Sequence, residues 1–156
     1  MKARLYILFG LLFLFSCSEP GKIVQDYQSI DHEIWSDKQR LSFPFEIVNN
    51  KKAHNLFYMV RYNKDYPYYN LYVKRFLLDS TGKEISSTLQ GMYLFDEKTG
   101  HPKGSGWGND YDYSILSDSN FRFPYNGKYT IAIQQYMRKD TIEGVSDFGI
   151  SVSEHE

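Results

Sequence analysis

Hydrophobic and polar residues alternate along most of the chain after residue 22, with the period of two that is typical of strands. The clearest example is residues 41–47, where apolar side chains occupy every second position and Ser42, Pro44 and Glu46 lie between them. Pro44 has no backbone N–H for a sheet ladder, so this strand is expected at a sheet edge or at a bulge. One face of such a strand is predicted to pack on a core while the other face meets solvent.

Further strands are predicted wherever short apolar runs are separated by turns rich in Gly, Asn, Asp and Ser, at spacings of about 8–12 residues. These runs cover residues 56–62, 70–78, 85–94, 111–115, 129–133 and 148–152. No window after residue 22 shows the convincing apolar stripe of an amphipathic helix. The sequence therefore predicts an all-β fold: a single antiparallel β-sandwich, either jelly-roll or immunoglobulin-like, over residues 31–156.

An apolar segment near the N-terminus, residues 5–15, departs from this alternation and follows the basic residues Lys2 and Arg4. It is shorter than the roughly 20 residues that a membrane-spanning helix needs, and it has the length of the hydrophobic region of a secretory signal peptide. We therefore expect residues 1–16 to be a signal peptide that is absent from the mature protein. Residues 17–30 are expected to form a tether between the membrane and the sandwich.

Cys17, the only cysteine of the chain, ends the run Leu14-Phe15-Ser16-Cys17. This run resembles the bacterial lipobox, whose cysteine is acylated and becomes the first mature residue. The alternative is an ordinary signal peptide with a chance cysteine. Acylation of Cys17 would supply more than one acyl chain, which gives stable membrane attachment. Ser18 rather than Asp after the cysteine favours the outer membrane, and the absence of an acidic run favours its periplasmic face.

Composition removes several classes of function. The formal net charge is -1, which argues against a protein that binds nucleic acid mainly through its phosphates. A single cysteine can form neither an internal disulfide nor a cysteine-based zinc site. Aromatic residues make up 17% of the chain, which argues against disorder and leaves core packing or ligand stacking to explain the excess.

No group of residues has the spacing of a catalytic or cofactor site. Four histidines are spread along the chain, at His32, His54, His101 and His155. The run Gly104–Gly108 lacks the lysine of a phosphate-binding loop and no helical pattern follows it. Asp110 and Asp112 are interpreted as the solvated face of a strand, with calcium binding as the alternative. We expect a protein that is not an enzyme and that holds neither a cofactor nor a metal.

Aromatic residues in or next to turns are the remaining candidates for an interaction surface, namely Tyr66, Tyr68, Tyr69, Trp107 and Tyr111. Exposed rings could stack on a glycan, as in carbohydrate-binding modules, or could form a protein interface, where an apolar ring with a polar tip is useful. The third interpretation is that these rings fill the interior of the sandwich.

Several runs of the mature chain are similar to the gliding motility lipoprotein family GldH of the Bacteroidetes. They are Tyr66–Tyr72, the Gly104–Asp110 loop, Phe123–Thr130, Gln134–Arg138 and Gly144–Ile150. Their order and spacing extend the resemblance over essentially the whole mature chain. Cys17 fits the same family as its lipidated position.

This resemblance implies a lipid-anchored accessory protein of the gliding apparatus, which is linked with the type IX secretion system. It implies no enzyme activity and no catalytic residues. Family members are thought to support other lipoproteins, so the expected partners are the membrane, through the N-terminal lipid, and other gliding or envelope lipoproteins. The alternative function is a lipid-anchored carbohydrate-binding module, with a glycan as ligand.

Overall fold

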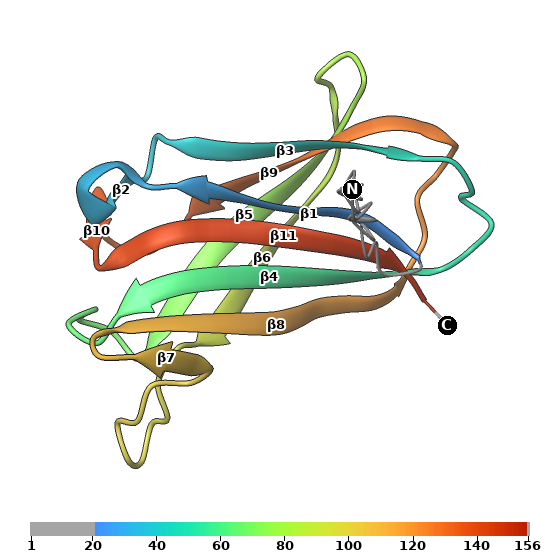
Figure 1. Cartoon of the computed structure of the whole chain (residues 1–156). Helices are drawn as coiled ribbons and strands as arrows, with labels where there is room; N and C mark the ends of the chain where they lie inside the picture. Colours follow the sequence, from blue (N-terminus) through green and yellow to red (C-terminus); the bar gives the residue numbers. More distant parts are fainter. Residues whose placement is uncertain (1–20, 156) are drawn as a thin grey trace, which may run out of the picture.

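The computed structural model describes residues 21–155 as strands joined by turns, with one short 3₁₀ helix, η1 (Asp31–Glu33) (Figure 1). The strands are β1 (Lys22–Ser29), β2 (Ile34–Ser36), β3 (Arg40–Ile47), β4 (His54–Asn63), β5 (Asn70–Asp79), β6 (Glu84–Tyr93), β7 (Ser105–Trp107), β8 (Asp110–Phe121), β9 (Gly127–Gln135), β10 (Thr141–Glu143) and β11 (Val145–Glu154). Within these residues, no helix has the length and apolar character that a bilayer span requires.

The strands form two large antiparallel sheets and one small one. The five-stranded sheet has the order β1-β11-β4-β8-β7, and the four-stranded sheet has the order β3-β9-β5-β6. Without the short strands β2, β7 and β10, this is the order of an eight-stranded jelly roll, in which the first strand pairs with the last. The predicted antiparallel β-sandwich is confirmed, and the strand order is that of its jelly-roll form.

The alternation of the sequence places one face of each large sheet in the core. In β3 the residues Leu41, Phe43, Phe45 and Ile47 are buried, while the residues between them are exposed. This strand lies at the edge of the four-stranded sheet, as Pro44 predicts. The core therefore occupies the space between the two sheets, which also approach each other along β1 and β3.

The globular part begins within residues 17–30, which were expected to form a tether, rather than at residue 31. Residues Lys22–Ser29 form β1, which pairs with β11 and is an edge strand of the five-stranded sheet. The sequence did not indicate this strand, because its apolar and polar residues do not alternate regularly. In the structure its register with β11 shifts between Lys22 and Val24, and its inward residues are only half-buried. The signal peptide and Cys17 lie outside the described residues.

One end of the sandwich, at the left in Figure 1, is closed by the small sheet of β2 and β10. Trp35 of β2 lies opposite Ile142 of β10, and both side chains are buried. The Trp35 ring centroid is 5.5 Å from that of Phe148 in β11, and its Nε1–H donates to the carbonyl of Gln39 at 3.3 Å. A large ring thus seals this end of the core.

Polar groups connect the sheets on the side where β6 faces β8. Arg75 of β5 is buried, forms an ion pair with Asp118 and donates to the Ser117 hydroxyl at 3.1 Å. The Gln90 side chain of β6 donates to the carbonyl of Ser117 at 3.2 Å and accepts from its hydroxyl at 2.9 Å. Gln90 also accepts from the hydroxyl of Tyr58. Because a buried guanidinium needs polar partners, these contacts fix the position of β5 and β6 against β8.

Substitution of the two tryptophans should have opposite consequences for stability. Trp35→Ala removes a fully buried ring, and large-to-small changes of this kind cost about 3–5 kcal/mol of unfolding free energy. Trp107→Ala removes an exposed ring and should change this free energy by no more than about 0.5 kcal/mol. Urea denaturation followed by circular dichroism measures both values. Equal losses in the two variants would contradict this account of how the end of the core is sealed.

Candidate functional site

The predicted aromatic residues separate into rings that pack and rings that are exposed. Tyr66 is only 4% exposed, and its ring centroid lies 5.6 Å from that of Tyr68 and 6.5 Å from that of Phe95. Tyr111 is half-buried and lies 5.9 Å from Tyr62 by the same measure. These contacts join the β4–β5 and β6–β7 connections to the end of the core. Tyr66 therefore contributes to packing rather than to exposed surface.

Hydrogen bonds to backbone carbonyls hold two of these rings in place. The hydroxyl of Tyr62 donates to the carbonyls of Leu94 and Lys103, each at 2.6 Å, and that of Tyr66 donates to Asn70 at 2.9 Å. Burial raises the pKa of Tyr62 to about 12 and also raises the pKa of Tyr66. Both hydroxyls consequently remain protonated donors at neutral pH, which suits a structural role.

Trp107 is presented by the β7–β8 hairpin, and its side chain is 94% exposed. Steric and backbone constraints explain why glycines surround Trp107 in the sequence. A Cβ at Gly106 would lie 2.2 Å from the carbonyl oxygen of Asp110, and one at Gly104 would be equally close to the β8 backbone. Gly108 has a φ of +68°, which favours glycine. The glycine-rich run thus allows β7 to pair closely with β8 and leaves Trp107 exposed.

Asp112, considered above for calcium, is engaged with two neighbouring side chains on the outer face of the five-stranded sheet. It accepts from the Tyr27 hydroxyl at 3.1 Å and from Nε of Arg61 at 3.0 Å. The guanidinium carbon of Arg61 also lies 4.3 Å from the centroid of the Tyr27 ring. Among the described residues, no group of three or more His, Cys, Asp or Glu is placed to hold a metal ion.

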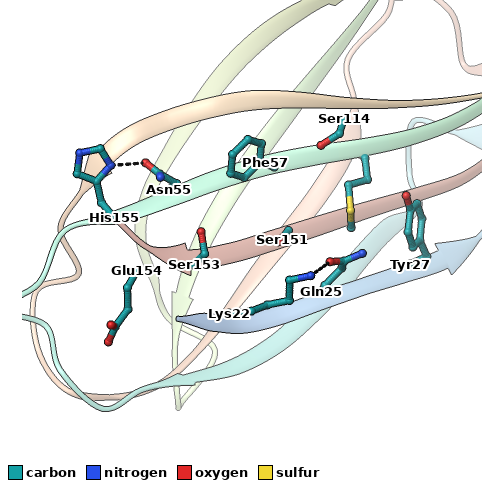
Figure 2. A pocket seen from close by; sticks show the side chains of 11 residues that line it. Lys22, Gln25, Tyr27, Asn55, Phe57, Ser114, Ser151, Ser153, Glu154 and His155 are labelled. Carbon is teal, nitrogen blue, oxygen red and sulfur yellow. Dashed lines mark hydrogen bonds between the residues drawn. The ribbon is translucent and has the colours of Figure 1, made fainter. Parts of the chain in front are cut away.

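A shallow groove of about 710 Å³ lies on this outer face, along β11 (Figure 2). Its lining includes the small side chains of Ser151 and Ser153 in β11. The larger Gln25 and Tyr27 from β1 stand on one side, and Phe57 from β4 stands on the other. The hollow forms because the small residues of β11 lie between larger residues on the neighbouring strands β1 and β4. The groove offers hydroxyl groups beside two rings, a combination that suits an extended polar ligand. The sequence patterns did not indicate this groove.

His54 is the buried histidine of the described chain. It starts β4, its ring meets that of Phe123 edge-on at 5.1 Å, and its Nδ1 has no hydrogen-bond partner there. Burial lowers the pKa of His54, so that it stays neutral near pH 7. His32 is exposed in η1, and His155 hydrogen-bonds to Asn55 at 2.9 Å. The histidines therefore occupy unlike environments.

The strand β6 is the least protected outer edge of the two large sheets. The other edges are blunted or covered, since β3 contains Pro44, β7 has three residues, and β1 lies against β3, where the Gln28 side chain exchanges hydrogen bonds with the Ser42 backbone. In contrast, β6 has ten residues without proline or lysine, and the segment Glu84–Leu89 is exposed on both faces. This strand leaves an extended backbone edge open for pairing.

Aromatic and aliphatic side chains gather beside this edge, on the outer face of the four-stranded sheet. We name them the β6 surface: Tyr68, Tyr72, Leu89, Tyr93 and Tyr136. Four of the five line a hollow of about 540 Å³. The Tyr72 ring lies across Gly91 of β6, where a Cβ would be only 2.5 Å from it. Of the predicted site residues, only Tyr68 belongs to this group.

The fold and these surfaces define a compact jelly-roll domain with an exposed, partly aromatic sheet edge. The chain matches the GldH lipoprotein family over residues 22–152, and it belongs to that family. The match covers the described sandwich almost from end to end. As a member of a lipoprotein family, the protein is attached to a membrane through lipid.

Two curated relatives extend over nearly the same length. The gliding motility lipoprotein GldH homolog of Christiangramia forsetii is 30% identical, with 97% of this chain and 95% of the relative aligned. The gliding motility lipoprotein GldH of Flavobacterium johnsoniae is 24% identical, with 96% and 95% aligned. The dimeric latent PorU of Porphyromonas gingivalis, a crystal structure, aligns with 86% of this chain and 13% of its own, at 8% identity and a TM-score of 0.27. That likeness is too distant to support any conclusion.

The buried His54 should make stability depend on pH. Its pKa in the folded chain is lower than the value of about 6.5 in an unfolded chain, so protonation favours unfolding. Its contribution is present above the unfolded pKa and is lost as the pH falls toward the folded pKa. We expect His54→Leu to lose less unfolding free energy than the native chain between pH 7.5 and pH 5.5.

The control for this measurement is His32→Asn, which removes an exposed histidine and tolerates the φ of +50° at that position. Urea titrations at several pH values give the unfolding free energies. If His54→Leu shows the same pH dependence as the native chain and His32→Asn, the assignment of that dependence to His54 is wrong.

Proposed function

We propose that this protein is a non-catalytic accessory component of the gliding apparatus, acting through protein–protein contacts. In this role it supports the assembly or stability of machinery linked with type IX secretion, by binding other envelope lipoproteins. Membership in the GldH lipoprotein family supports a place in the gliding apparatus, and the names of both curated relatives include gliding motility. The structural observation that carries the proposal is the unprotected edge of β6.

We further propose that the lipid is attached at Cys17 and holds the domain at the periplasmic face of the outer membrane. The lipobox-like run and Ser18 support this location. Cys17 precedes the start of β1 at Lys22 by five positions, so the connection spans at most about 18 Å. The domain is therefore kept close to the bilayer, where other lipoproteins are also confined.

Strand addition is the binding mode that β6 favours. Every residue from Glu84 to Leu89 is exposed, so neither face of this segment is covered by the rest of the sandwich. A partner strand would hydrogen-bond to the open backbone edge and extend the four-stranded sheet. The main-chain bonds would give affinity, and alternate side chains would give specificity.

The β6 surface provides apolar contacts for the side chains of such a strand. Leu89 lies within β6 itself, and Tyr72 projects over the same sheet face from β5. Tyr136 follows β9 and is linked to β5 by its backbone N–H, which donates to the carbonyl of Tyr72 at 2.7 Å. Exposed aromatic side chains of this kind are enriched in protein interfaces.

Leu89→Lys tests the proposal because it places a charge on the open strand, a device that discourages pairing at sheet edges. The matched control is Leu116→Lys in β8: the two leucines are 53% and 51% exposed, but Leu116 lies in the other sheet. Each variant replaces the native gene in a deletion strain. Gliding, type IX secretion and the levels of other envelope lipoproteins are then measured.

We expect Leu89→Lys to resemble the deletion strain and Leu116→Lys to resemble the native strain, with both proteins present in equal amounts. Native behaviour of Leu89→Lys would contradict strand addition at β6. A deletion strain with unchanged gliding, secretion and lipoprotein levels would contradict the accessory function as a whole.

A further inference from the structure

We propose that one end of the sandwich binds the headgroups of anionic phospholipids and so orients the domain on its membrane. This region, named the anchor end, comprises the start of β1, the β3–β4 and β8–β9 connections, Lys128 and the end of β11. In Figure 1 these segments meet at the right of the molecule, opposite the β2–β10 sheet and the β7–β8 hairpin.

Hydrogen bonds join the segments of the anchor end into one surface. The backbone N–H of Glu154 donates to the carbonyl of Gly21 at 2.8 Å, and that of His155 donates to Ala53 at 2.8 Å. The Arg122 guanidinium donates to the carbonyl of Lys51 at 2.7 Å, which connects the β8–β9 and β3–β4 loops. The position at which the chain enters the fold therefore belongs to the same surface as these loops.

A second set of contacts keeps the two loops rigid. The backbone N–H of Asn50 donates to Oδ1 of Asn126 at 2.7 Å, and the Asn50 side chain donates to the carbonyl of Pro124 at 3.1 Å. The ring of Tyr125 stacks on that of Tyr129, with centroids 5.0 Å apart. Because the loops are held by these bonds, little conformational entropy is lost when they meet a surface.

The charge of the anchor end is basic although the whole chain is nearly neutral. Its exposed cationic side chains are Lys22, Lys51, Lys52, Arg122 and Lys128. Three acidic residues of the described chain lie beside them. Glu154 pairs with Lys52, Glu46 lies opposite Lys128 in the sheet, and Asp79 lines the same hollow as Lys128. Each basic residue near an anionic membrane contributes about 1 kcal/mol of attraction.

Two apolar side chains accompany these charges. Val48 is 76% exposed in the β3–β4 loop, and Tyr125 is exposed in the β8–β9 loop. A tyrosine has the apolar body and polar tip that suit the interface between headgroups and acyl chains. Basic residues with a few apolar ones are the combination that binds a membrane surface without crossing it.

The short connection to the lipid attachment point indicates that the anchor end meets a bilayer rather than another partner. With lipid at Cys17, the connection of at most about 18 Å ends at Lys22, within the anchor end itself. A lipid chain alone would hold the domain near the bilayer without fixing its orientation. A basic surface around the attachment point adds the second, electrostatic contact that strengthens a lipid anchor.

Vesicle flotation tests this proposal with the mature chain from residue 17 carrying Cys17→Ser. This chain lacks the acyl groups but retains residues 22–154, from which both large sheets are built. The probes are phosphatidylcholine vesicles with and without roughly 30% phosphatidylglycerol, at low salt and at high salt. We expect binding to the anionic vesicles, weaker binding at high salt, and little binding to pure phosphatidylcholine.

The decisive variant is Lys51→Glu with Lys128→Glu, which reverses two exposed charges of the anchor end. The matched control is Lys64→Glu with Lys98→Glu, an equal charge change in the β4–β5 and β6–β7 loops at the other end. The apparent partition coefficient should fall at least about tenfold in the first double variant and less than about twofold in the control.

Circular dichroism first establishes that both double variants are folded. Equal losses in the two would show that net charge rather than the anchor end governs binding, and would overturn the proposal. Equal binding of the native chain to neutral and anionic vesicles, or binding to neither, would also overturn it. None of these results bears on β6 as a protein-binding edge, because no partner protein is present.

Discussion

The contacts of Arg75 set the geometry on which the exposed surface of this protein depends. Its buried guanidinium lies between the sheets and is satisfied by Asp118 and Ser117 of β8, while Gln90 of β6 bonds to the same serine. Losing one partner would leave another polar group buried and unpaired, which is costly, so these contacts must form together. The sheets are therefore joined at Gln90, and the preceding half of β6 extends beyond the cover of the five-stranded sheet.

The consequence is an edge strand that contributes less to the core than its length suggests. Met92 and the half-buried Gln90 face the interior, whereas residues 84–89 of the same strand remain exposed. Natural sheets usually protect such an edge, as β3 and β7 do here. An unprotected edge on a protein held at a membrane, together with exposed rings beside it, is what supports the proposed pairing with a partner strand.

Local structure could be predicted from the sequence where a single residue type has one structural consequence. Alternation in residues 41–47, together with Pro44, predicted a half-buried edge strand, and the structure confirms it. Prediction was weaker where long-range pairing decides the outcome. The irregular Lys22–Ser29 segment becomes a strand through β11, and Tyr66 becomes buried because Phe95 from another connection packs against it. The Arg75 contacts were not predictable, because their four other residues come from three different strands.

The two proposed contacts, with the membrane and with a partner protein, use different surfaces of the molecule. The anchor end faces the bilayer near the attachment point, while β6 runs along the side of the sandwich and remains accessible to proteins on the same membrane. Orientation by the basic surface would present this edge in a constant direction. Confinement to one membrane raises the effective concentration of both partners, so a modest interface would suffice for association.

The most direct test of the central claim is photo-cross-linking in living cells, with a photoreactive amino acid in place of Leu89 or, as the reference, Leu116. The account predicts a specific cross-link from position 89 to an envelope lipoprotein, no such product from position 116, and loss of the product when the partner gene is deleted. Cross-links from position 116 but not from position 89, in cells with functional protein, would contradict the assignment of β6 as the binding edge.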